Sequence, residues 1–302
     1  MLTRELLAGG YTDKAIARLV RRGVLVSIRH GAYAYADMWP RLSPVERRQL
    51  IALAVLRSAR SPVALSGPSA AEALGVPVWE PGEETHLLRL DGKAGRREAG
   101  RVEHRGHAIA EDLTFKAGRP ITSGTRTAID MIAISDTPHA LVTVNGLLNA
   151  GETTLKQIEY RMRSMRTDPH LLNSHVVLGL ADPRIESAGE SLASWMFWRQ
   201  HLPRPTPQYE VRNRNGRVIH RVDFAWPELG VFLEFDGKEK YLRHRRPGES
   251  VVDAVLREKR REELICGLTG WRCIRIIWSD LFRAERTAAR ILATLEGRPW
   301  AA

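Results

Sequence analysis

The sequence predicts an α/β protein with several domains, in which strands and helices are mixed (a multi-domain α+β chain). The chain has 302 residues, more than a typical single domain. Its hydrophobic fraction of 43% is ordinary for a globular protein and is enough to build real cores. Strand-like runs such as GVFLEF and WRCIRIIW are separated by helical patterns. We expect domains at residues 1–80, 81–182 and 183–302.

Charge, cysteine use and hydropathy narrow the class of partner. The formal net charge is +11 and the sequence pI is about 10.1, which favours nucleic acid over a membrane. A generally arginine-rich proteome is the alternative explanation. The sequence has no apolar run of about 18 residues and no signal-peptide core in MLTRELLAGG. Cys266 and Cys273 have no CxxC partner, so we expect reduced thiols in a cytoplasmic protein.

The first 40 residues predict two helices followed by a hairpin. Thr12 is a good N-cap for a helix over residues 13–22, which Gly23 ends. One face of that helix is apolar and another is basic. The runs VLVSI and AYAY flank a turn at residues 29–31 and predict the hairpin. Helix, basic helix and hairpin is the element order of a winged helix.

This N-terminal segment resembles the antitoxin domain of the AbiEi type, on the run LVRRGVLVSIRHGAYAY. The resemblance implies a DNA-binding domain and a toxin protein as a possible partner. A basic helix of this size fits a major groove, and an arginine on the wing can reach the backbone beside it. An ordinary solvated face is the alternative. The candidate DNA contacts are Lys14, Arg18, Arg21, Arg22 and Arg29.

We interpret residues 41–182 as a structural scaffold. Residues 41–80 have a helical pattern, with a capping box from Ser43 to Glu46 and a buried apolar run at residues 50–56. From residue 83 onward the pattern mixes strands and helices, with a polar, flexible stretch DGKAGRREAG between two strands. His86, His104 and His107 fit no standard zinc spacing and no cysteine accompanies them, so we expect no metal there.

The last domain predicts a sheet with helices around it. A helix follows Ser187, and a hairpin turns at Asn215-Gly216, the strongest short-range turn signal in the chain. A further helix over about 251–268 is followed by the strand GWRCIRIIW, which should lie parallel to its predecessor in the same sheet.

Three acidic residues stand on the two central strands of this domain. Asp223 lies in the first strand, the turn covers residues 226–230, and Glu234 lies in the second strand, with Asp236 at its end. Because strand side chains alternate, Glu234 and Asp236 point to the same face. An ionised carboxylate on a buried strand is costly unless a positive group pairs with it. A divalent cation would do so, which suggests phosphodiester hydrolysis.

The domain resembles the PD-(D/E)XK nuclease superfamily, in the branch related to very-short-patch-repair endonucleases. The resemblance rests on DFAWPELGVFLEFDGKEKY, on the upstream helix ESAGESLASWMFWR, and on the downstream run REKRREELICGLTGWRCIRIIWSDL. It covers residues 183–302 and implies a restriction-endonuclease-like mixed sheet flanked by helices.

The resemblance also implies roles for the acids. Asp223 and Glu234 would bind Mg²⁺ or Mn²⁺, and Asp236 or Glu190 would be further acids of the site. The capping box from Ser187 to Glu190 offers another explanation, in which Glu190 only caps its helix. We expect no small-molecule cofactor.

The expected acid-x-Lys lysine is replaced by Asp236 in this sequence. Lys238 or Lys240 could supply the ammonium instead, or Lys259 on the following helix. Lys240 is preferred, because Lys238 and Lys240 leave the strand on the carboxylate side if extension continues past Gly237.

Basic clusters around these acids are candidates for phosphate contacts. One lies in the loop YLRHRRPGES and another on the helix after it, where glutamates could instead make intrahelical pairs. Arg272 and Arg275 on the last strand could flank the site or be solvated. The loop cluster consists of Arg243, His244, Arg245 and Arg246, and the helical one of Arg257, Lys259, Arg260 and Arg261.

Two functions remain open at this point. The first is a metal-dependent endonuclease for DNA, guided by the winged helix, in a toxin–antitoxin or phage-defence setting. The second is a non-catalytic, antitoxin-like transcriptional regulator with a vestigial nuclease fold. Unpaired acids on a core strand favour the nuclease, whereas the missing lysine favours the regulator. The sequence has no Gly-rich phosphate loop and no GxSxG, which excludes NTP hydrolysis and serine chemistry.

Overall fold

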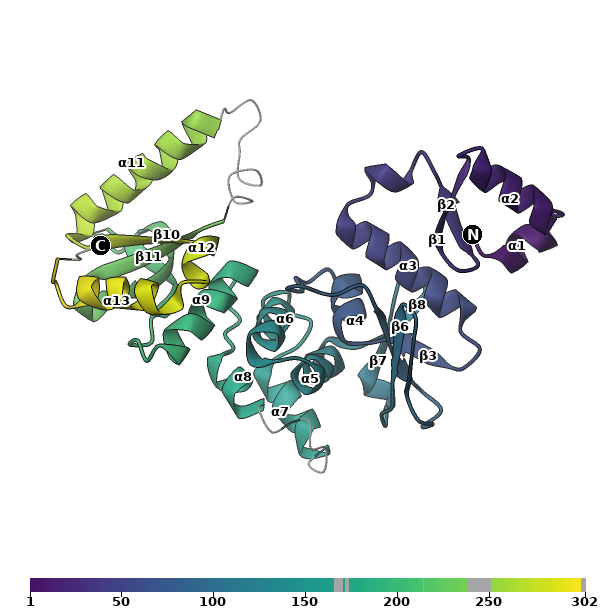
Figure 1. Ribbon diagram of the computed structural model, residues 1–302. Coiled ribbons are helices and arrows are strands. Elements are labelled where there is room, and N and C mark those ends of the chain that lie inside the picture. The colour runs from purple at the N-terminus through teal and green to yellow at the C-terminus, as the bar shows by residue number, and fades with distance from the viewer. Residues whose placement is uncertain (166–170, 172–173, 214, 238–250, 300–302) are drawn as a thin grey trace. The chain divides into compact units, whose positions relative to one another are not determined.

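A computed structural model describes residues 1–165, 171, 174–213, 215–237 and 251–299 (Figure 1). It confirms a mixed α/β protein, with β1–β2, a six-stranded sheet and a four-stranded sheet. The chain forms two compact units. The first contains Met1–Thr143 with Ala150–Ser174, and the second contains Val144–Asn149 with His175–Ala302. Among the helices within the described ranges, none combines the length and the apolar character needed to cross a membrane.

The N-terminal segment has the predicted order of helix, basic helix and hairpin. Thr12 Oγ1 accepts a hydrogen bond from Ala15 N at 3.2 Å, so the predicted N-cap of α2 is confirmed. A small core forms where Leu6 of α1 and Ile16 of α2 pack on Leu25 of β1. The elements are α1 (Thr3–Ala8), α2 (Asp13–Arg21), β1 (Leu25–Arg29) and β2 (Ala32–Tyr35).

The rest of the first unit is built on the six-stranded sheet, with strand order β5-β6-β4-β3-β8-β7. Its strands are β3 (Val63–Leu65), β4 (Thr85–Arg89), β5 (Arg96–Glu98), β6 (Arg101–His104), β7 (Leu113–Lys116) and β8 (Arg119–Thr122). Its helices are η1 (Trp39–Arg41), α3 (Pro44–Ser58), α4 (Gly67–Leu74), η2 (Ala110–Asp112), α5 (Gly124–Ile134), α6 (Thr137–Asn149), which continues into the second unit, and α7 (Leu155–Arg163).

Two predictions for this unit were wrong. The helical pattern assigned to residues 41–80 contains β3, a strand of three buried residues that pairs with β4 and β8. A strand this short has no recognisable period of its own, and its pairing partners lie far along the sequence. The stretch assigned as a flexible connection contains β5, whose three exposed residues pair antiparallel with β6.

Two histidines of this sheet contact each other. His86 on β4 and His104 on β6 stack with ring centroids 5.1 Å apart, and His86 Nδ1 lies 2.9 Å from His104 Nε2. Burial, and then the neighbouring His104, lower the pKa of His86 to about 4. Burial also lowers the pKa of His104. Both rings are therefore neutral at pH 7, and one donates to the other.

The second unit contains a four-stranded sheet in the order β12-β11-β10-β9. The strands β9, β10 and β11 are antiparallel, whereas β12 lies parallel to β11 as predicted. The strands are β9 (Thr206–Arg212), β10 (Val218–Trp226), β11 (Val231–Asp236) and β12 (Arg272–Ile277). The helices are α8 (Ser174–Leu180), α9 (Ala188–Arg199), η4 (Pro227–Leu229), α11 (Val251–Thr269), α12 (Trp278–Leu281) and α13 (Ala284–Leu295).

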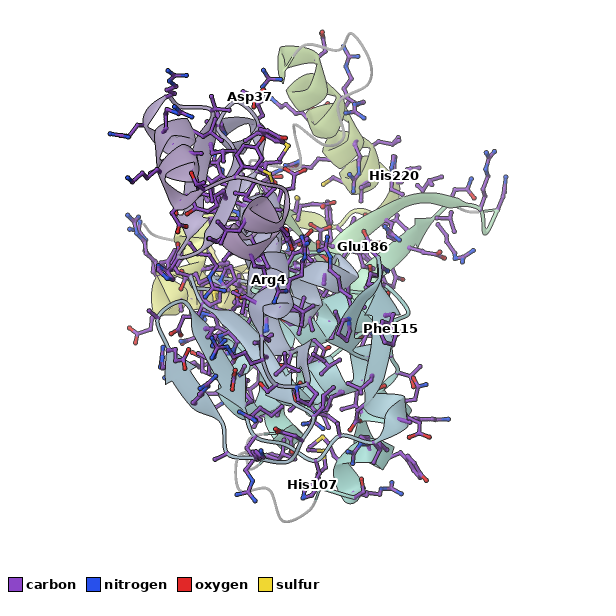
Figure 2. The ribbon with its side chains drawn as sticks, turned by 90° about the vertical axis from the view of Figure 1, so that its right-hand side faces the viewer. Arg4, Asp37, His107, Phe115, Glu186 and His220 are labelled. Atoms are coloured by element: carbon purple, nitrogen blue, oxygen red, sulfur yellow. The ribbon has the colours of Figure 1, made fainter. Side chains whose placement is uncertain are left out.

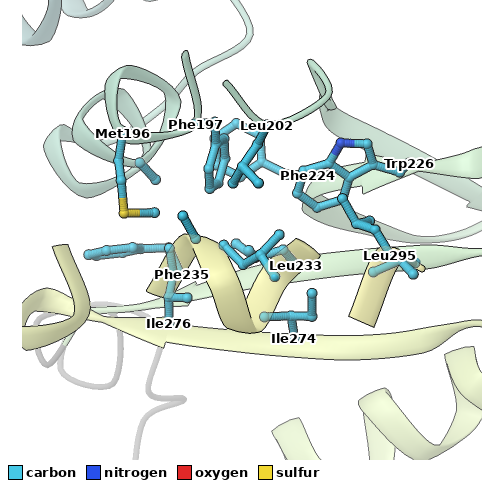
Figure 3. Packing of buried hydrophobic residues seen from close by; sticks show 14 residues of the cluster. Met196, Phe197, Leu202, Phe224, Trp226, Leu233, Phe235, Ile274, Ile276 and Leu295 are labelled. Carbon is cyan, nitrogen blue, oxygen red and sulfur yellow. The ribbon is translucent and has the colours of Figure 1, made fainter. Parts of the chain in front are cut away.

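Helices cover both faces of this sheet (Figure 1). On one face, α9 and α13 pack over Phe224 and Leu233, and Figure 3 shows Phe197 of α9 against this cluster. On the other face, Ile265 of α11 packs over Val222 and Phe232. Apolar burial of this kind holds the central strands β10 and β11 from both sides, so the acids that they carry have fixed positions.

The histidine pair predicts a pH dependence of stability. The pKa of His86 falls from 6.5 to about 4 on folding, so the unfolded chain binds more protons between these values. Stability should therefore be full above pH 6.5 and fall by about 2–3 kcal/mol as the pH approaches 4. Denaturant unfolding over this range should show a shallower loss for His86→Asn, while His30→Asn, at an exposed position, keeps the wild-type profile. Equal profiles for all three proteins would contradict this account.

Candidate active site

Asp223 and Glu234 lie on the two central strands, where the β10–β11 ladder ends. The ladder runs from Trp226 opposite Val231 to Phe224 opposite Leu233. The same register would next bring Asp223 opposite Glu234. Both residues are nearly buried, at 7% and 8% exposed. Beyond the last pair, Phe235 N donates to Asp223 Oδ2 at 2.8 Å. A main-chain amide therefore orients the Asp223 carboxylate.

Glu190 is the third acid of this region, at 1% exposed in the first turn of α9. Its backbone N donates to Ser187 Oγ at 3.2 Å, and Ser187 Oγ donates to its Oε1 at 2.7 Å. Its Oε2 accepts from Glu186 N at 3.1 Å and from Gln208 Nε2 at 2.8 Å. Ser187 is thus the N-cap of α9, whereas the Glu190 carboxylate accepts from Glu186 N and Ser187 Oγ and binds the sheet through Gln208.

Gln208 is a site residue that the sequence did not reveal. It lies on β9 between Pro207, which is opposite Phe224, and Tyr209, which is opposite Val222. This places it across from Asp223 on the neighbouring strand. Its φ of 51° is in the left-handed region, which non-glycine residues seldom adopt. The residue with this unusual backbone conformation is also the one whose side chain contacts Glu190. Nothing in the pattern TPQYEVR predicts either feature.

Arginines pair with the two carboxylates of β11, Glu234 and Asp236. Arg261 Nη2 of α11 donates to Glu234 Oε1 at 2.8 Å and to the carbonyl oxygen of Arg221 at 2.6 Å. Arg275 Nη1 of β12 donates to Asp236 Oδ2 at 2.7 Å. Arg275 therefore flanks the site, one of the two alternatives that the sequence left open. These guanidiniums satisfy the negative charge that the strands place against α11.

The pairing overturns one premise drawn from the sequence. The sequence suggests unpaired acids on a core strand, whose retention would favour a nuclease. That premise was wrong, because Glu234 and Asp236 have arginine partners and Asp223 has an amide partner. The helical cation beside Glu234 is also Arg261, whereas Lys259 is exposed. Arg261 lies one helical turn before the buried Ile265, so it shares the face of α11 that packs on the sheet.

Several predicted site residues lie outside the described part of the chain. They are the candidate catalytic lysines Lys238 and Lys240 and the loop residues Arg243, His244, Arg245 and Arg246. The lysine that would replace the missing acid-x-Lys lysine therefore stays a prediction.

The donor set suits a hard divalent cation. Asp223, Glu234 and Glu190 offer carboxylate oxygens, which Mg²⁺ and Mn²⁺ prefer. Within the described ranges, no three acidic, histidine or cysteine side chains form a group that could hold a metal ion. A site for Mg²⁺ needs only one or two carboxylates when waters and phosphate oxygens complete the shell. Asp223 and Glu234 fit that requirement, with Arg261 beside Glu234 as a competing cation.

The basic residues of α2 form an exposed surface. Lys14, Arg18, Arg21 and Arg22 follow helical spacing along one side and are all exposed, while Ile16 faces the core. We call these four residues the α2 basic surface.

The hairpin arginine has a different environment from the α2 basic surface. Arg29 is half-buried, and its Nη1 donates to Ser58 Oγ of α3 at 3.3 Å. Burial, and then the charge of Arg101, lower its pKa. Arg29 therefore contributes to the contact between the hairpin and α3.

Comparison with known proteins gives relatives and no function. No protein-family model matches the chain. The chain is similar to the uncharacterized protein MT2308 of Mycobacterium tuberculosis strain CDC 1551 / Oshkosh, and to the uncharacterized protein Rv2248 of strain ATCC 25618 / H37Rv. Each is 29% identical over 285 residues, which cover 92% of this chain and 94% of the relative. The similarity therefore spans nearly the full length of these proteins.

The absence of a side chain at Gly189 allows α9, which carries Glu190, to approach β11 closely. A Cβ added at Gly189 would lie 2.1 Å from Phe235 Cε1. Gly189→Ala should therefore destabilise the protein by about 1–3 kcal/mol through overpacking. Gly267→Ala in α11 is the matched control, because an added Cβ there meets nothing within 4 Å and alanine favours the helix. Thermal unfolding should show a lowered Tm for the first variant only, and an unchanged Tm for Gly189→Ala would refute the close contact.

Proposed function

We propose that this protein is a metal-dependent endonuclease that hydrolyses DNA phosphodiester bonds. The observation that carries the proposal is the position of two nearly buried acidic residues, Asp223 and Glu234, each directly after the last pair of the β10–β11 ladder. Glu190 joins the same region through Gln208 on the next strand. Nearly buried acids need positive charge beside them. Arg261 supplies it at Glu234 in this structure, and a hard cation with phosphate ligands uses the same donor type.

Asp223 and Glu234 would hold Mg²⁺ or Mn²⁺. Such a cation, when bound, neutralises charge on the scissile phosphate and promotes ionisation of the attacking water. The amide of Phe235 keeps the Asp223 carboxylate in a fixed orientation. Glu190 anchors the start of α9 to β9 through Gln208, which preserves the spacing of the acids.

Arg261 and the lysines would have separate tasks. A guanidinium is always protonated, so Arg261 can bind a phosphate oxygen but cannot remove a proton from water. To bind a phosphate oxygen, Arg261 would exchange its contact with Glu234 for one with the substrate. A lysine from the segment after β11, Lys238 or Lys240, remains the candidate for orienting or deprotonating the water.

The net charge and the α2 basic surface support DNA as the substrate. The chain carries a charge of +11, and the exposed side of α2 presents four cations at helical spacing. A helix of this kind can enter a major groove and hold the protein on DNA. A DNA substrate also implies a cytoplasmic place of action.

The second candidate is a non-catalytic DNA-binding regulator of the antitoxin type, acting with a toxin protein. The observation that favours it is the arginine pairing of Glu234 and Asp236. These guanidiniums satisfy the acids without a metal ion, so a vestigial site could retain them. The replacement of the acid-x-Lys lysine by Asp236 agrees with this alternative.

Plasmid nicking separates the two candidates. We expect cleavage by the purified protein with Mg²⁺ or Mn²⁺ and none with EDTA. Asp223→Asn and Glu234→Gln should each slow cleavage by roughly 100-fold or more, because each removes a charge that would hold the ion. Glu285→Gln removes one charge from an exposed position of α13 and should cleave like wild type.

Two results would count against the nuclease. Equal cleavage by wild type and Asp223→Asn would mean that other residues, or a contaminant, perform the reaction. An absence of cleavage together with tight retardation of the same DNA would support the regulator.

DNA binding by the α2 basic surface has its own test. Arg18→Ala combined with Arg21→Ala should weaken binding to duplex DNA and reduce the slope of log K against log salt concentration by about 1.8. Arg60→Ala combined with Arg286→Ala removes the same charge from exposed positions elsewhere and is the control. Fluorescence anisotropy over a salt series measures both quantities. An unchanged slope in the α2 double variant would exclude this surface from the interface.

A further inference from the structure

A groove of about 700 Å³ runs along β9, an edge strand of the four-stranded sheet. Figure 2 shows the β9–β10 ribbon extending away from the sheet, with His220 on it. The side chains that matter for its chemistry are Arg184, Gln208, Tyr209, Arg212, Arg221 and Trp271. All of them belong to the second unit.

The groove shares residues with the candidate active site. Gln208 lines the groove, and its Nε2 donates to Glu190 Oε2 at 2.8 Å. Arg221 also lines the groove, and its carbonyl oxygen accepts from Arg261, the partner of Glu234. One wall of the groove therefore continues into the residues that hold the acids. A ligand in the groove would lie beside the site.

Three arginines give the groove the donors that a phosphate chain needs. The side chains of Arg184, Arg212 and Arg221 are 53%, 55% and 51% exposed. Arg212 and Arg221 pair with Glu210 and Glu186, which also line the groove, and water screens these exposed pairs strongly, so they are weak. Arg184 instead makes a two-bond contact with Asp182, whose side chain is 12% exposed. Each guanidinium has five N–H donors, more than its carboxylate partner uses. A phosphate can therefore bind these groups at small cost.

An aromatic pair lies among these arginines. The rings of Tyr209 and Trp271 are 5.5 Å apart with an interplanar angle of 39°, and both residues line the groove while half-buried. Aromatic faces beside exposed arginines are the elements on which bases of single strands stack. The bases of a duplex are already stacked and paired, so their faces cannot reach such a pair.

We propose that this groove binds a single-stranded segment of nucleic acid next to the candidate active site. The proposal names the form of nucleic acid that the candidate active site receives. It rests on the proposed function for the role of the neighbouring acids. Phosphates contact Arg212 and Arg221, and a base stacks on Tyr209 or Trp271. DNA and RNA single strands share this chemistry.

The first experiment measures binding in the full chain carrying Arg18→Ala and Arg21→Ala, so that the α2 basic surface does not mask the groove. Fluorescein-labelled oligothymidine and oligouridine of about 12 nucleotides are titrated with EDTA present, which prevents metal-dependent cleavage. Adding Arg212→Ala and Arg221→Ala should weaken binding about tenfold and reduce the salt slope by about 1.4. The control pair is Arg199→Ala with Arg286→Ala, which removes exposed charge outside the groove. The two oligonucleotides tell DNA from RNA.

The second experiment locates the base without altering the fold. An oligonucleotide that carries 5-iododeoxyuridine is cross-linked by ultraviolet light to the protein with an unmodified groove. Mass spectrometry should find the adduct on the peptides that contain Tyr209 or Trp271. An unlabelled single strand should compete for the cross-link more strongly than a duplex of equal length.

Three results would overturn the proposal: unchanged affinity and salt slope in the groove variant, adducts mapped to other peptides, or better competition by the duplex. The first would mean that the single strand binds elsewhere on the protein. Failure of the groove is distinct from failure of the nuclease. Metal-dependent nicking without groove binding overturns only this inference, whereas groove binding without nicking overturns only the proposed function.

Discussion

The arrangement of the C-terminal sheet depends on neutralising negative charge that its central strands carry. Glu234 and Asp236 follow apolar residues on β11 and face α11. Arg261 from that helix and Arg275 from β12 supply the opposing charge. Glu234 is nearly buried, so removing Arg261 would leave a poorly solvated charge, which is costlier than a broken exposed pair. Asp236 and Arg275 are 23% and 31% exposed, so water screens their pair more. The two arginines therefore hold α11 and β12 to the strand while they satisfy it.

The same interaction links stability to function. A guanidinium and a divalent cation both satisfy carboxylates, and Glu234 contacts one guanidinium already. The nuclease proposal requires an exchange at Glu234, with a phosphate drawing Arg261 away as an ion arrives. A non-catalytic regulator requires no such exchange, because Arg261 would remain paired with Glu234. The groove along β9 is relevant to this choice. A nucleic-acid strand bound there would bring phosphates beside Arg221, whose carbonyl oxygen contacts Arg261.

Local patterns predicted the fold around the site, whereas long-range contacts escaped them. The strand-turn-strand from Val222 to Phe235 follows from apolar runs on both sides of a Pro-Glu-Leu-Gly turn, and the structure confirms it. The partners of the acids did not follow. Arg261 meets Glu234 across 27 residues, and Gln208 meets Glu190 through a backbone conformation that its residue type does not favour. Only tertiary packing determines such contacts, so the sequence identifies the acids but not the residues that pair with them.

Titration of the protein with Mn²⁺, followed by electron paramagnetic resonance, shows whether Asp223 and Glu234 bind a divalent ion. Wild-type protein and Asp223→Asn are compared, each with and without an uncleavable DNA oligonucleotide. We expect wild-type protein to bind Mn²⁺ more tightly with DNA present, because phosphate then competes for Arg261, and Asp223→Asn to lose this binding. Wild-type protein that binds the DNA but takes up no Mn²⁺ in either condition would contradict a metal site at these acids.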